Sequence, residues 1–330
     1  MRFALVLTNV TSVDATWTSV HLGAAILRAG HELCIWEPAD FEVTETGRLV
    51  ARAWCVDTAP ESVELLGRAI SGQRLPRKYI DLSSCDRLLM RVNPLSLAAE
   101  QFCLLAQEQG VHVVNDPAGA ARTRAKAWLA SLPADVPRPR TLVTGSRSAA
   151  RNFLDAVGST VVVKPASGSG GRGVSLVPTR RHDILERSLS TAAARGVTHV
   201  VLQEYLSEAR DGEKRIVWVD GVLLGAYQRQ RADGDFRHNL KQGARPTPCT
   251  VDAADQAINA AISPHLVRNG IRIAGLDVIG GRLVEVNTLN PGGVHWADSL
   301  GEKPTGWIAD EAIRLLAAAP SHPRTERKDP

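Results

Sequence analysis

The sequence predicts an α/β protein: an N-terminal α/β domain built on a parallel sheet, a central α+β region, and a C-terminal domain with a mixed sheet. Three observations predict this fold. Over the first 120 residues, short apolar segments alternate with helices that end at glycine, a pattern typical of parallel strands covered by helices. From residue 160 onward, strands joined by hairpin-like turns replace this alternation. The chain then closes with a helix, a pair of strands and a second helix.

The N-terminal region supplies the parallel sheet. Strands are expected at 2–8, 31–38, 86–92 and 111–115, and helices at 19–30 and 97–110. The helices end at Gly30 and Gly110, because glycine readily adopts the left-handed conformation that terminates a helix. A dinucleotide-binding fold needs a glycine fingerprint directly after its first strand, and none follows residue 8. This region is therefore predicted to be a parallel α/β domain without a dinucleotide site.

The central and C-terminal regions are expected to be rich in hairpins. Residues 133–141 contain three prolines and are predicted to be a connector. Strands are then expected at 160–165, 173–178, 199–206, 213–230 and 273–287, and helices at 255–270 and 307–319. Asp220-Gly221 and Gly280-Gly281 mark two-residue turns within the last two strand ranges. The predicted division is 1–121 for the N-terminal domain, 122–200 for the central region, 201–319 for the C-terminal domain and 320–330 for a disordered tail.

Composition excludes several classes of protein. Hydrophobic residues make up 44% and charged residues 22% of the chain, which is ordinary for a globular protein, and no apolar run reaches the roughly 18 residues of a membrane span. The net charge of +4 is modest, and no basic run interleaved with aromatic residues precedes the tail, so no nucleic-acid partner is expected. Without a signal peptide or a CxxC pair, the scattered thiols indicate a cytoplasmic protein. The five cysteines are Cys34, Cys55, Cys85, Cys103 and Cys249.

A glycine-rich loop between two expected strands is the first chemical signal. Residues 161–177 are VVVKPASGSGGRGVSLV, with Lys164 at the end of the incoming strand. The VSLVP that follows Gly173 has strand character, and no Gly-Lys-Ser/Thr follows the loop, so neither a Rossmann site nor a Walker A loop fits. Backbone N–H groups of such a loop can bind a triphosphate, and a lysine supplies positive charge. Phosphate binding is therefore favoured over a surface linker, the alternative reading.

A second group of polar residues lies on the expected C-terminal strand pair. Asp277 is on one strand, and Glu285 and Asn287 are on the next. Side chains two residues apart on a strand point to the same face, so Glu285 and Asn287 can lie beside Asp277. Two carboxylates and an amide oxygen suit Mg²⁺ that is shared with nucleotide phosphates. A solvated strand face would give the same pattern, but its combination with the glycine loop favours a nucleotide site.

Taken in order, a set of segments resembles the ATP-grasp superfamily and, within it, the bacterial glutathione synthetases. The segments are LVLTNV, MRVNPL, VVNDPAGAARTRAKAW, VVVKPASGSGGRGV, QEYL, DGEKRIVWVDG, RHNLKQGA and GLDVIGGRLVEVN. The resemblance implies an ATP-grasp fold in which residues 122–200 form a lid that carries the glycine-rich loop, with ATP held between the lid and the C-terminal domain. It also implies a ligase that phosphorylates a carboxylate with ATP and joins the resulting acyl phosphate to an amine. In glutathione synthetase these substrates are γ-glutamylcysteine and glycine, and the resemblance suggests a homodimer or homotetramer.

The resemblance also assigns roles to individual residues. Contacts to ATP are implied for Lys126, Lys164, Ser167, Gly168, Ser169, Gly170, Gly171, Gly173, Gln203, Glu204, Tyr205, Leu206 and Glu213. Magnesium ligands are implied at Asp277, Glu285 and Asn287, for a pair of Mg²⁺ ions that Mn²⁺ can replace. Positions near the transferred phosphate and the substrate are implied for Arg215, Arg229, Arg237 and Asn239.

Two segments depart from the family pattern, and both would contact substrate. After Asn287 the family has Ser/Thr-Pro-Thr/Gly, whereas residues 288–296 here are TLNPGGVHW. Asn290, Gly292 and Gly293 are candidates for holding a substrate carboxylate through backbone N–H groups, with a plain turn as the alternative. Near the start, TSVDATWTS carries Asp14 and Trp17 where the family has lysine and serine.

These departures leave the substrates open. A related ligase acting on another amino acid, peptide or small acid in natural-product biosynthesis is an alternative to glutathione synthesis. A non-catalytic ATP-binding regulatory protein is a hypothesis of another class. It predicts a degenerate site, whereas the implied set of lysines, arginine, carboxylates and amide is intact.

Overall fold

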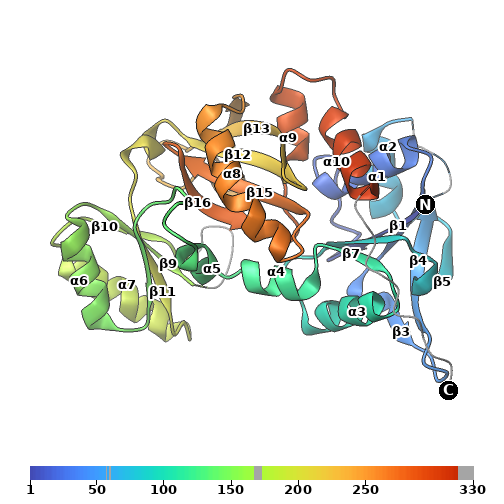
Figure 1. Cartoon of the computed structure of the whole chain (residues 1–330), viewed down its shortest axis with the longest axis horizontal. Coiled ribbons are helices and arrows are strands. Elements are labelled where there is room, and N and C mark those ends of the chain that lie inside the picture. The colour runs from blue at the N-terminus through green and yellow to red at the C-terminus, as the bar shows by residue number, and fades with distance from the viewer. Residues whose placement is uncertain (57, 59–60, 167–172, 319–330) are drawn as a thin grey trace.

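The computed structural model describes residues 1–56, 58, 61–166 and 173–318. The strands of these residues form three sheets. An N-terminal sheet of seven strands lies at one end, and a four-stranded sheet lies at the other. A five-stranded sheet lies between them (Figure 1). None of the helices in the described ranges has the length and apolar character that a membrane span requires.

The N-terminal sheet contains the predicted parallel strands. They are β1 (Arg2–Leu7), β2 (Glu32–Trp36), β6 (Arg87–Arg91) and β7 (His112–Val114). Alternate residues of β1 face opposite sides. Phe3 and Leu5 share a core with α1 (Thr18–Arg28), whereas Ala4 and Val6 share another with α3 (Leu97–Glu108). Helices therefore cover both faces of this sheet, as the sequence predicts.

This sheet is mixed and not wholly parallel, which corrects the prediction. The additional strands are β3 (Phe41–Val43), β4 (Leu49–Val56) and β5 (Arg77–Asp81), with helix α2 (Val63–Ser71) between β4 and β5. After β2, the chain enters a short 3₁₀ turn at Pro38–Asp40 and then a hairpin, so β4 pairs antiparallel with β2. A parallel pair would need a longer crossover at this point.

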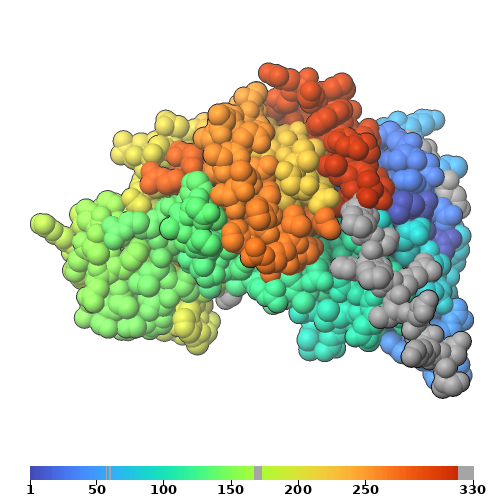
Figure 2. Space-filling view, in the orientation of Figure 1, coloured from blue at the N-terminus to red at the C-terminus, as the bar shows by residue number. Residues whose placement is uncertain are grey.

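The four-stranded sheet has the order β10-β9-β11-β8. Its strands are β8 (Thr141–Thr144), β9 (Val161–Pro165), β10 (Ser175–Val177) and β11 (Val200–Glu204), and its helices are α6 (Arg147–Val157) and α7 (His182–Ala194). Val161 and Val163 of β9 pack in one core with Leu154 and Leu185 from the two helices. The helices therefore cover one face and leave the other open, and Figure 2 shows this part as a lobe at one end of the molecule.

Strand β11 shows where the lobe ends. It pairs antiparallel with both β8 and β9, so residues 201–204 belong to the four-stranded sheet. The boundary predicted between 200 and 201 falls within this strand, and the change of sheet comes after Glu204. Two short helices, α4 (Pro117–Thr123) and α5 (Lys126–Ser131), lead from the N-terminal sheet into the lobe.

The five-stranded sheet has the order β14-β13-β12-β15-β16. Its strands are β12 (Glu213–Val219), β13 (Val222–Gln230), β14 (Arg245–Pro248), β15 (Ile273–Ile279) and β16 (Arg282–Asn287). Every neighbouring pair is antiparallel, so this sheet is not the mixed sheet predicted for the C-terminal domain. Two-residue turns join β12 to β13 and β15 to β16, and such short connections join only antiparallel strands. The turns predicted at Asp220-Gly221 and Gly280-Gly281 are present, all four residues with positive φ.

Helices cover the five-stranded sheet on both sides. Ile258 and Ile262 of α8 (Ala253–Arg268) share a core with Trp218. On the opposite side, α9 (Val294–Leu300) and α10 (Trp307–Ala318) share a core with Val217 and with α1. The C-terminal helices therefore join the central sheet to the N-terminal one.

Candidate active site

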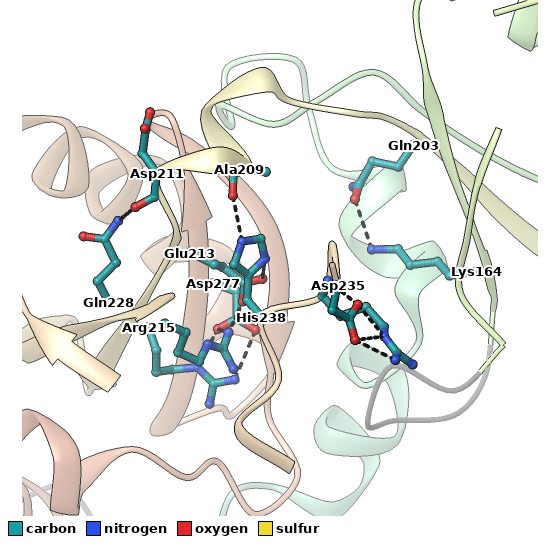
Figure 3. A network of polar contacts seen from close by, with 12 residues as sticks. Lys164, Gln203, Ala209, Asp211, Glu213, Arg215, Gln228, Asp235, His238 and Asp277 are labelled. Atoms are coloured by element: carbon teal, nitrogen blue, oxygen red, sulfur yellow. Dashed lines mark hydrogen bonds and ion pairs between the residues drawn. The ribbon is translucent and has the colours of Figure 1, made fainter. Parts of the chain in front are cut away.

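A pocket opens between the uncovered face of the four-stranded sheet and one face of the five-stranded sheet. Residues from both sheets line it, and Figure 3 shows Lys164 and Gln203 on one side with Glu213, Arg215, His238 and Asp277 on the other. Most of the site residues predicted from the sequence lie in its lining. They are Lys164, Gln203, Glu204, Tyr205, Leu206, Glu213, Arg215, Arg229, Arg237, Asn239, Asp277, Glu285 and Asn287.

The remaining predicted residues lie elsewhere. Lys126 lines an adjoining cavity that also includes Lys164 and Glu285. Gly173 is described, with φ of 72°, just before β10, but it is not among the lining residues of the pocket. The predicted loop residues Ser167, Gly168, Ser169, Gly170 and Gly171 lie outside the described residues. Asn290, Gly292 and Gly293 do not line the pocket either.

Strand β9 brings Lys164 into the pocket by alternation. Val161 and Val163 face the helices of the lobe, so Val162 and Lys164 face the other way. The Lys164 Nζ donates to Gln203 Oε1 at 3.0 Å and forms no ion pair with a described residue. Burial lowers the pKa of Lys164, and the neighbouring Lys126 adds to this, while Glu285 and Asp277 oppose it. The lysine therefore lines the pocket with no carboxylate of the described residues in contact with its Nζ.

Apolar residues form the adjacent part of the wall. Leu206, Ala209 and Ile279 form a small buried cluster against which Tyr205 and Val284 pack. All five line the pocket. This part of the pocket suits a planar apolar group.

The opposite wall is a buried network of charges centred on Asp277. Arg215 donates to this carboxylate in a bidentate manner, with Nε–Oδ1 at 2.5 Å and Nη2–Oδ2 at 3.1 Å. Arg229 bridges Asp277, at 2.7 Å, and Glu213. Burial alone would raise the pKa of Asp277, but the two guanidinium groups outweigh it and lower the pKa to about 2. Asp277 is therefore ionised throughout the neutral range.

The three predicted metal ligands are adjacent. Asp277 and Glu285 are register partners across β15 and β16, and Asn287 Nδ2 donates to Asp277 Oδ2 at 3.0 Å. Glu285 Oε1 accepts from Lys126 Nζ at 3.2 Å. No group of three or more His, Cys, Asp or Glu side chains able to hold a metal occurs in the described ranges. Two carboxylates and one amide fit a Mg²⁺ ion only if phosphate oxygens complete its coordination, which is how Mg²⁺ usually binds in nucleotide sites.

The loop between β13 and β14 contains two further predicted residues, Arg237 and Asn239, whose side chains bond to groups of this loop. Arg237 pairs with Asp235, with Nη2–Oδ2 at 2.7 Å. Asn239 Oδ1 accepts from the Lys241 N–H at 2.9 Å, which caps a short 3₁₀ helix at Leu240–Gln242. Both side chains line the pocket, but each is engaged within its own loop.

Sequence reasoning missed His238, which lies between these two residues. Its side chain lines the pocket and contacts Ala209 and Glu213. A single histidine in a loop carries no periodic pattern, and no metal-ligand spacing marks it. Its position within RHNLKQGA, between two implied site residues, is the signal that could have found it.

The segment from Asn290 to Gly293 is held between the first helix and the charge network. Asn290 has a positive φ of 43°. The Gly292 carbonyl accepts from Arg215 Nη1 at 3.0 Å, and the Gly293 N–H donates to Thr18 Oγ1 at 3.1 Å. The Gly293 N–H is therefore engaged within the protein, and the carboxylate nest at Gly292 and Gly293 stays a prediction.

Comparisons with known proteins identify the family of the chain. A family model for the prokaryotic glutathione synthetase N-terminal domain matches residues 1–120, and one for the prokaryotic glutathione synthetase ATP-grasp domain matches residues 126–301. Glutathione synthetase from Thermosynechococcus vestitus (strain NIES-2133 / IAM M-273 / BP-1) is 30% identical over 328 residues, covering 93% of this chain and 99% of that protein. That from Synechococcus elongatus (strain ATCC 33912 / PCC 7942 / FACHB-805) is 30% identical over 332 residues, covering 96% and 98%.

A solved structure shares the fold. The crystal structure of D-cycloserine synthetase DcsG matches with a TM-score of 0.63 at 19% identity, covering 96% of this chain and 100% of that chain. The glutathione synthetase family uses ATP and a divalent metal ion in general, in keeping with the lysine, arginine and carboxylate groups that meet in the pocket. The chain belongs to the prokaryotic glutathione synthetase family and is a glutathione synthetase-like carboxylate–amine ligase with the ATP-grasp fold.

Proposed function

We propose that this ligase joins γ-glutamylcysteine to glycine at the expense of ATP. The observation that carries the proposal is the pocket itself, in which positive groups from the lobe and from the central sheet surround two adjacent carboxylates. That arrangement suits a magnesium-bound triphosphate. The full-length similarity to glutathione synthetases supports the choice of substrates.

We assign the nucleotide to the space between the two sheets. The backbone of Glu204 and Leu206 borders the apolar cluster and would bind the adenine, with Gln203 and Tyr205 beside it. Glu213 would bind the ribose. Lys126 and Lys164 would bind the phosphates, because each places an ammonium group near Glu285. The glycine loop Ser167–Gly173 would cover the phosphates through its backbone N–H groups.

Asp277, Glu285 and Asn287 would hold the metal, as a pair of Mg²⁺ ions that Mn²⁺ can replace. Bound there, Mg²⁺ would neutralise charge on the phosphates and align them. The present partners of the two carboxylates are positive side chains, namely Arg215 and Arg229 on Asp277 and Lys126 on Glu285.

The chemistry has two steps. In the first, a carboxylate oxygen of the acid attacks the γ-phosphorus, the bond from that phosphorus to the ADP oxygen breaks, and ADP leaves. In the second, the amine nitrogen attacks the acyl carbon, the bond from that carbon to the phosphate oxygen breaks, and phosphate and a proton leave. Arg215, Arg229, Arg237 and Asn239 line the pocket and would stabilise the charge that develops on the phosphate and the tetrahedral centre. Closure must exclude water, because water would hydrolyse the acyl phosphate.

We further propose a division into an N-terminal domain at 1–121, a lid at 122–204 and a C-terminal ATP-grasp domain from 205. The three sheets support it. A homodimer or homotetramer is proposed from the family resemblance, and light scattering on the purified protein tests it. A cytoplasmic location is in keeping with five cysteines that form no disulfide within the described ranges, four of them buried.

The test of the function is ADP release with Mg²⁺ and γ-glutamylcysteine, with and without glycine. We expect release to depend on both substrates and glutathione to appear in stoichiometric amount. Release stimulated by another acid–amine pair, with none from this pair, would overturn the substrate assignment.

One observation favours a second candidate, a ligase of the same class with another acid or amine. The segment after Asn287 and the loop at Asp14–Trp17 both depart from the family pattern. In the structure they meet, since the Thr18 hydroxyl accepts from the Gly293 N–H. A panel of amino acids and small acids in the same ADP assay distinguishes the two candidates.

A further inference from the structure

His238 lies at the edge of the predicted ribose position and has a fixed tautomer. It is in the loop between β13 and β14, is only 6% exposed, and lines the pocket. Its Nε2 is 2.8 Å from the Ala209 carbonyl oxygen. A carbonyl oxygen can only accept a hydrogen bond, so Nε2 carries the proton.

The ring is neutral near neutral pH. Burial lowers the pKa of His238, and the nearby Arg229 and Arg231 lower it further, although the Ala209 carbonyl and Asp277 oppose them. In a neutral imidazole only one nitrogen carries a proton. With that proton on Nε2, the Nδ1 atom has a lone pair and can only accept.

The Nδ1 atom faces a second acceptor. It is 3.5 Å from Glu213 Oε2, and within the described part of the chain no donor is hydrogen-bonded to Nδ1. The other oxygen of Glu213 accepts from Arg229. Figure 3 shows His238 between the Ala209 carbonyl and the Glu213 side chain. His238 Nδ1 and Glu213 Oε2 are therefore two adjacent, largely buried acceptors. Each needs a donor, because an unsatisfied polar group costs free energy when it is buried.

A vicinal diol provides two donors on neighbouring carbons. We infer that His238 Nδ1 and Glu213 Oε2 together bind the 2′- and 3′-hydroxyl groups of the nucleotide, which makes His238 a determinant of the preference for ribonucleotides over deoxyribonucleotides. The apolar cluster of Leu206, Ala209 and Ile279 lies beside the pair and would hold the base. The inference rests on the proposed function in that it requires a nucleotide in this pocket.

Two substitutions separate the two nitrogens of the ring. His238→Gln places an amide near the Nε2 position, where it can still donate to Ala209, and removes the acceptor at Nδ1. His238→Asn places an amide oxygen near the Nδ1 position and gives up the contact to Ala209. Circular dichroism and thermal unfolding establish that each variant is folded.

The experiment is isothermal titration of ADP, 2′-deoxy-ADP and 3′-deoxy-ADP, with Mg²⁺, into the unaltered protein and the two variants. It needs no acid or amine substrate. We expect the unaltered protein to bind ADP about fivefold more tightly than at least one deoxy analogue, the value of one ordinary hydrogen bond. We expect His238→Gln to lose that preference and His238→Asn to keep most of it.

Three results would contradict the inference. An undiminished preference in His238→Gln would show that Nδ1 does not contact the ribose. Equal loss in both variants would indicate that the ring only maintains the loop. Failure of the unaltered protein to bind any of the three nucleotides would contradict the proposed function as well, so the two failures are distinguishable.

Discussion

The carboxylate of Asp277 is the most constrained charged group of the site. Its pKa of about 2 lies below the ordinary value of 3.8, because Arg215 and Arg229 outweigh the effect of burial. A carboxylate whose pKa is lowered by folding stabilises the folded state at pH values above its unfolded pKa. That contribution is lost as the pH falls through the folded pKa.

The Asp277→Asn substitution should therefore change the acid limb of the stability curve. We expect the unaltered protein to lose about 2 kcal/mol from this group between pH 4 and pH 2, and the variant to lack that component. The measurement is the free energy of urea unfolding of both proteins across this range. Parallel curves for the two proteins would contradict the assignment of the lowered pKa to Asp277.

Glu285 gives a prediction of the opposite kind, in which activity falls while the fold is retained. Its side chain is 36% exposed and its pair with Lys126 spans 3.2 Å, so the pair adds little stability. We expect Glu285→Gln to lower kcat/KM by roughly 10²–10³, by analogy with the loss of one charge-stabilising group. The unfolding free energy should change by less than about 1 kcal/mol.

A matched control is available on the surface. Glu311 forms an exposed ion pair with Arg314 on α10, and Glu311→Gln should leave both activity and stability nearly unchanged. An active Glu285→Gln variant with ordinary magnesium dependence would refute the metal assignment.

Some residues of the site could be located from the sequence and others could not. Asp277, Glu285 and Asn287 could be grouped because strand alternation and a Gly-Gly turn determine their mutual positions. Arg237 and Asn239 could be assigned to the site only through the family resemblance, and the bonds of their side chains could not be predicted, because their loop has no repeating geometry. His238 was missed for the same reason.

At the scale of elements, alternation along β9 explains both the lobe and the pocket. Val161 and Val163 pack the four-stranded sheet against α6 and α7, while Lys164 lies on the opposite face, which lines the pocket. The parallel strands and the C-terminal hairpins could be predicted because local patterns specify them. Strands β3 to β5 could not, because β4 pairs antiparallel with β2 and with β5, and both pairings depend on contacts that are distant in the sequence.

Helix α4 gives a prediction about packing between elements. A Cβ added to Gly119 would meet the Asn269 carbonyl oxygen at 1.7 Å, at the end of α8. The Asn269 oxygen belongs to the backbone and cannot move aside as a flexible side chain would. We therefore expect Gly119→Ala to lower the unfolding free energy by about 1–3 kcal/mol or more. Thermal and urea unfolding measure this change.

The control for this substitution lies one residue earlier. Ala118 is exposed on the same helix, and Ala118→Ser should cost about 0.5 kcal/mol from helix propensity alone. Equal effects of the two substitutions would show that α4 and the end of α8 are not in close contact.

At the scale of the whole molecule, the site is complete only when the lobe and the central sheet act together. Lys164 and Gln203 come from the lobe, whereas Asp277 and Glu285 come from the central sheet. A ligand that contacts both the lobe and the central sheet binds only the state in which both are folded and close together. Binding therefore stabilises the two parts together.

Hydrogen exchange should show this coupling. We expect ADP with Mg²⁺ to slow amide exchange in β9 and β11 and, at the same time, in β15 and β16. Mass spectrometry of peptides from these strands measures the effect, and β4 in the N-terminal sheet is the internal control. Protection confined to one of the two sheets would mean that the nucleotide does not bridge them.

The central claim is that the pocket activates an acid by transferring the γ-phosphate of ATP to its carboxylate. The most direct measurement uses an acid labelled with ¹⁸O in the reacting carboxylate, γ-glutamylcysteine in the first instance, under turnover with ATP, Mg²⁺ and glycine. The account predicts that one ¹⁸O atom from the carboxylate appears in the inorganic phosphate, because the bond broken in the second step joins the acyl carbon to that oxygen. Phosphate free of ¹⁸O after amide formation would contradict it.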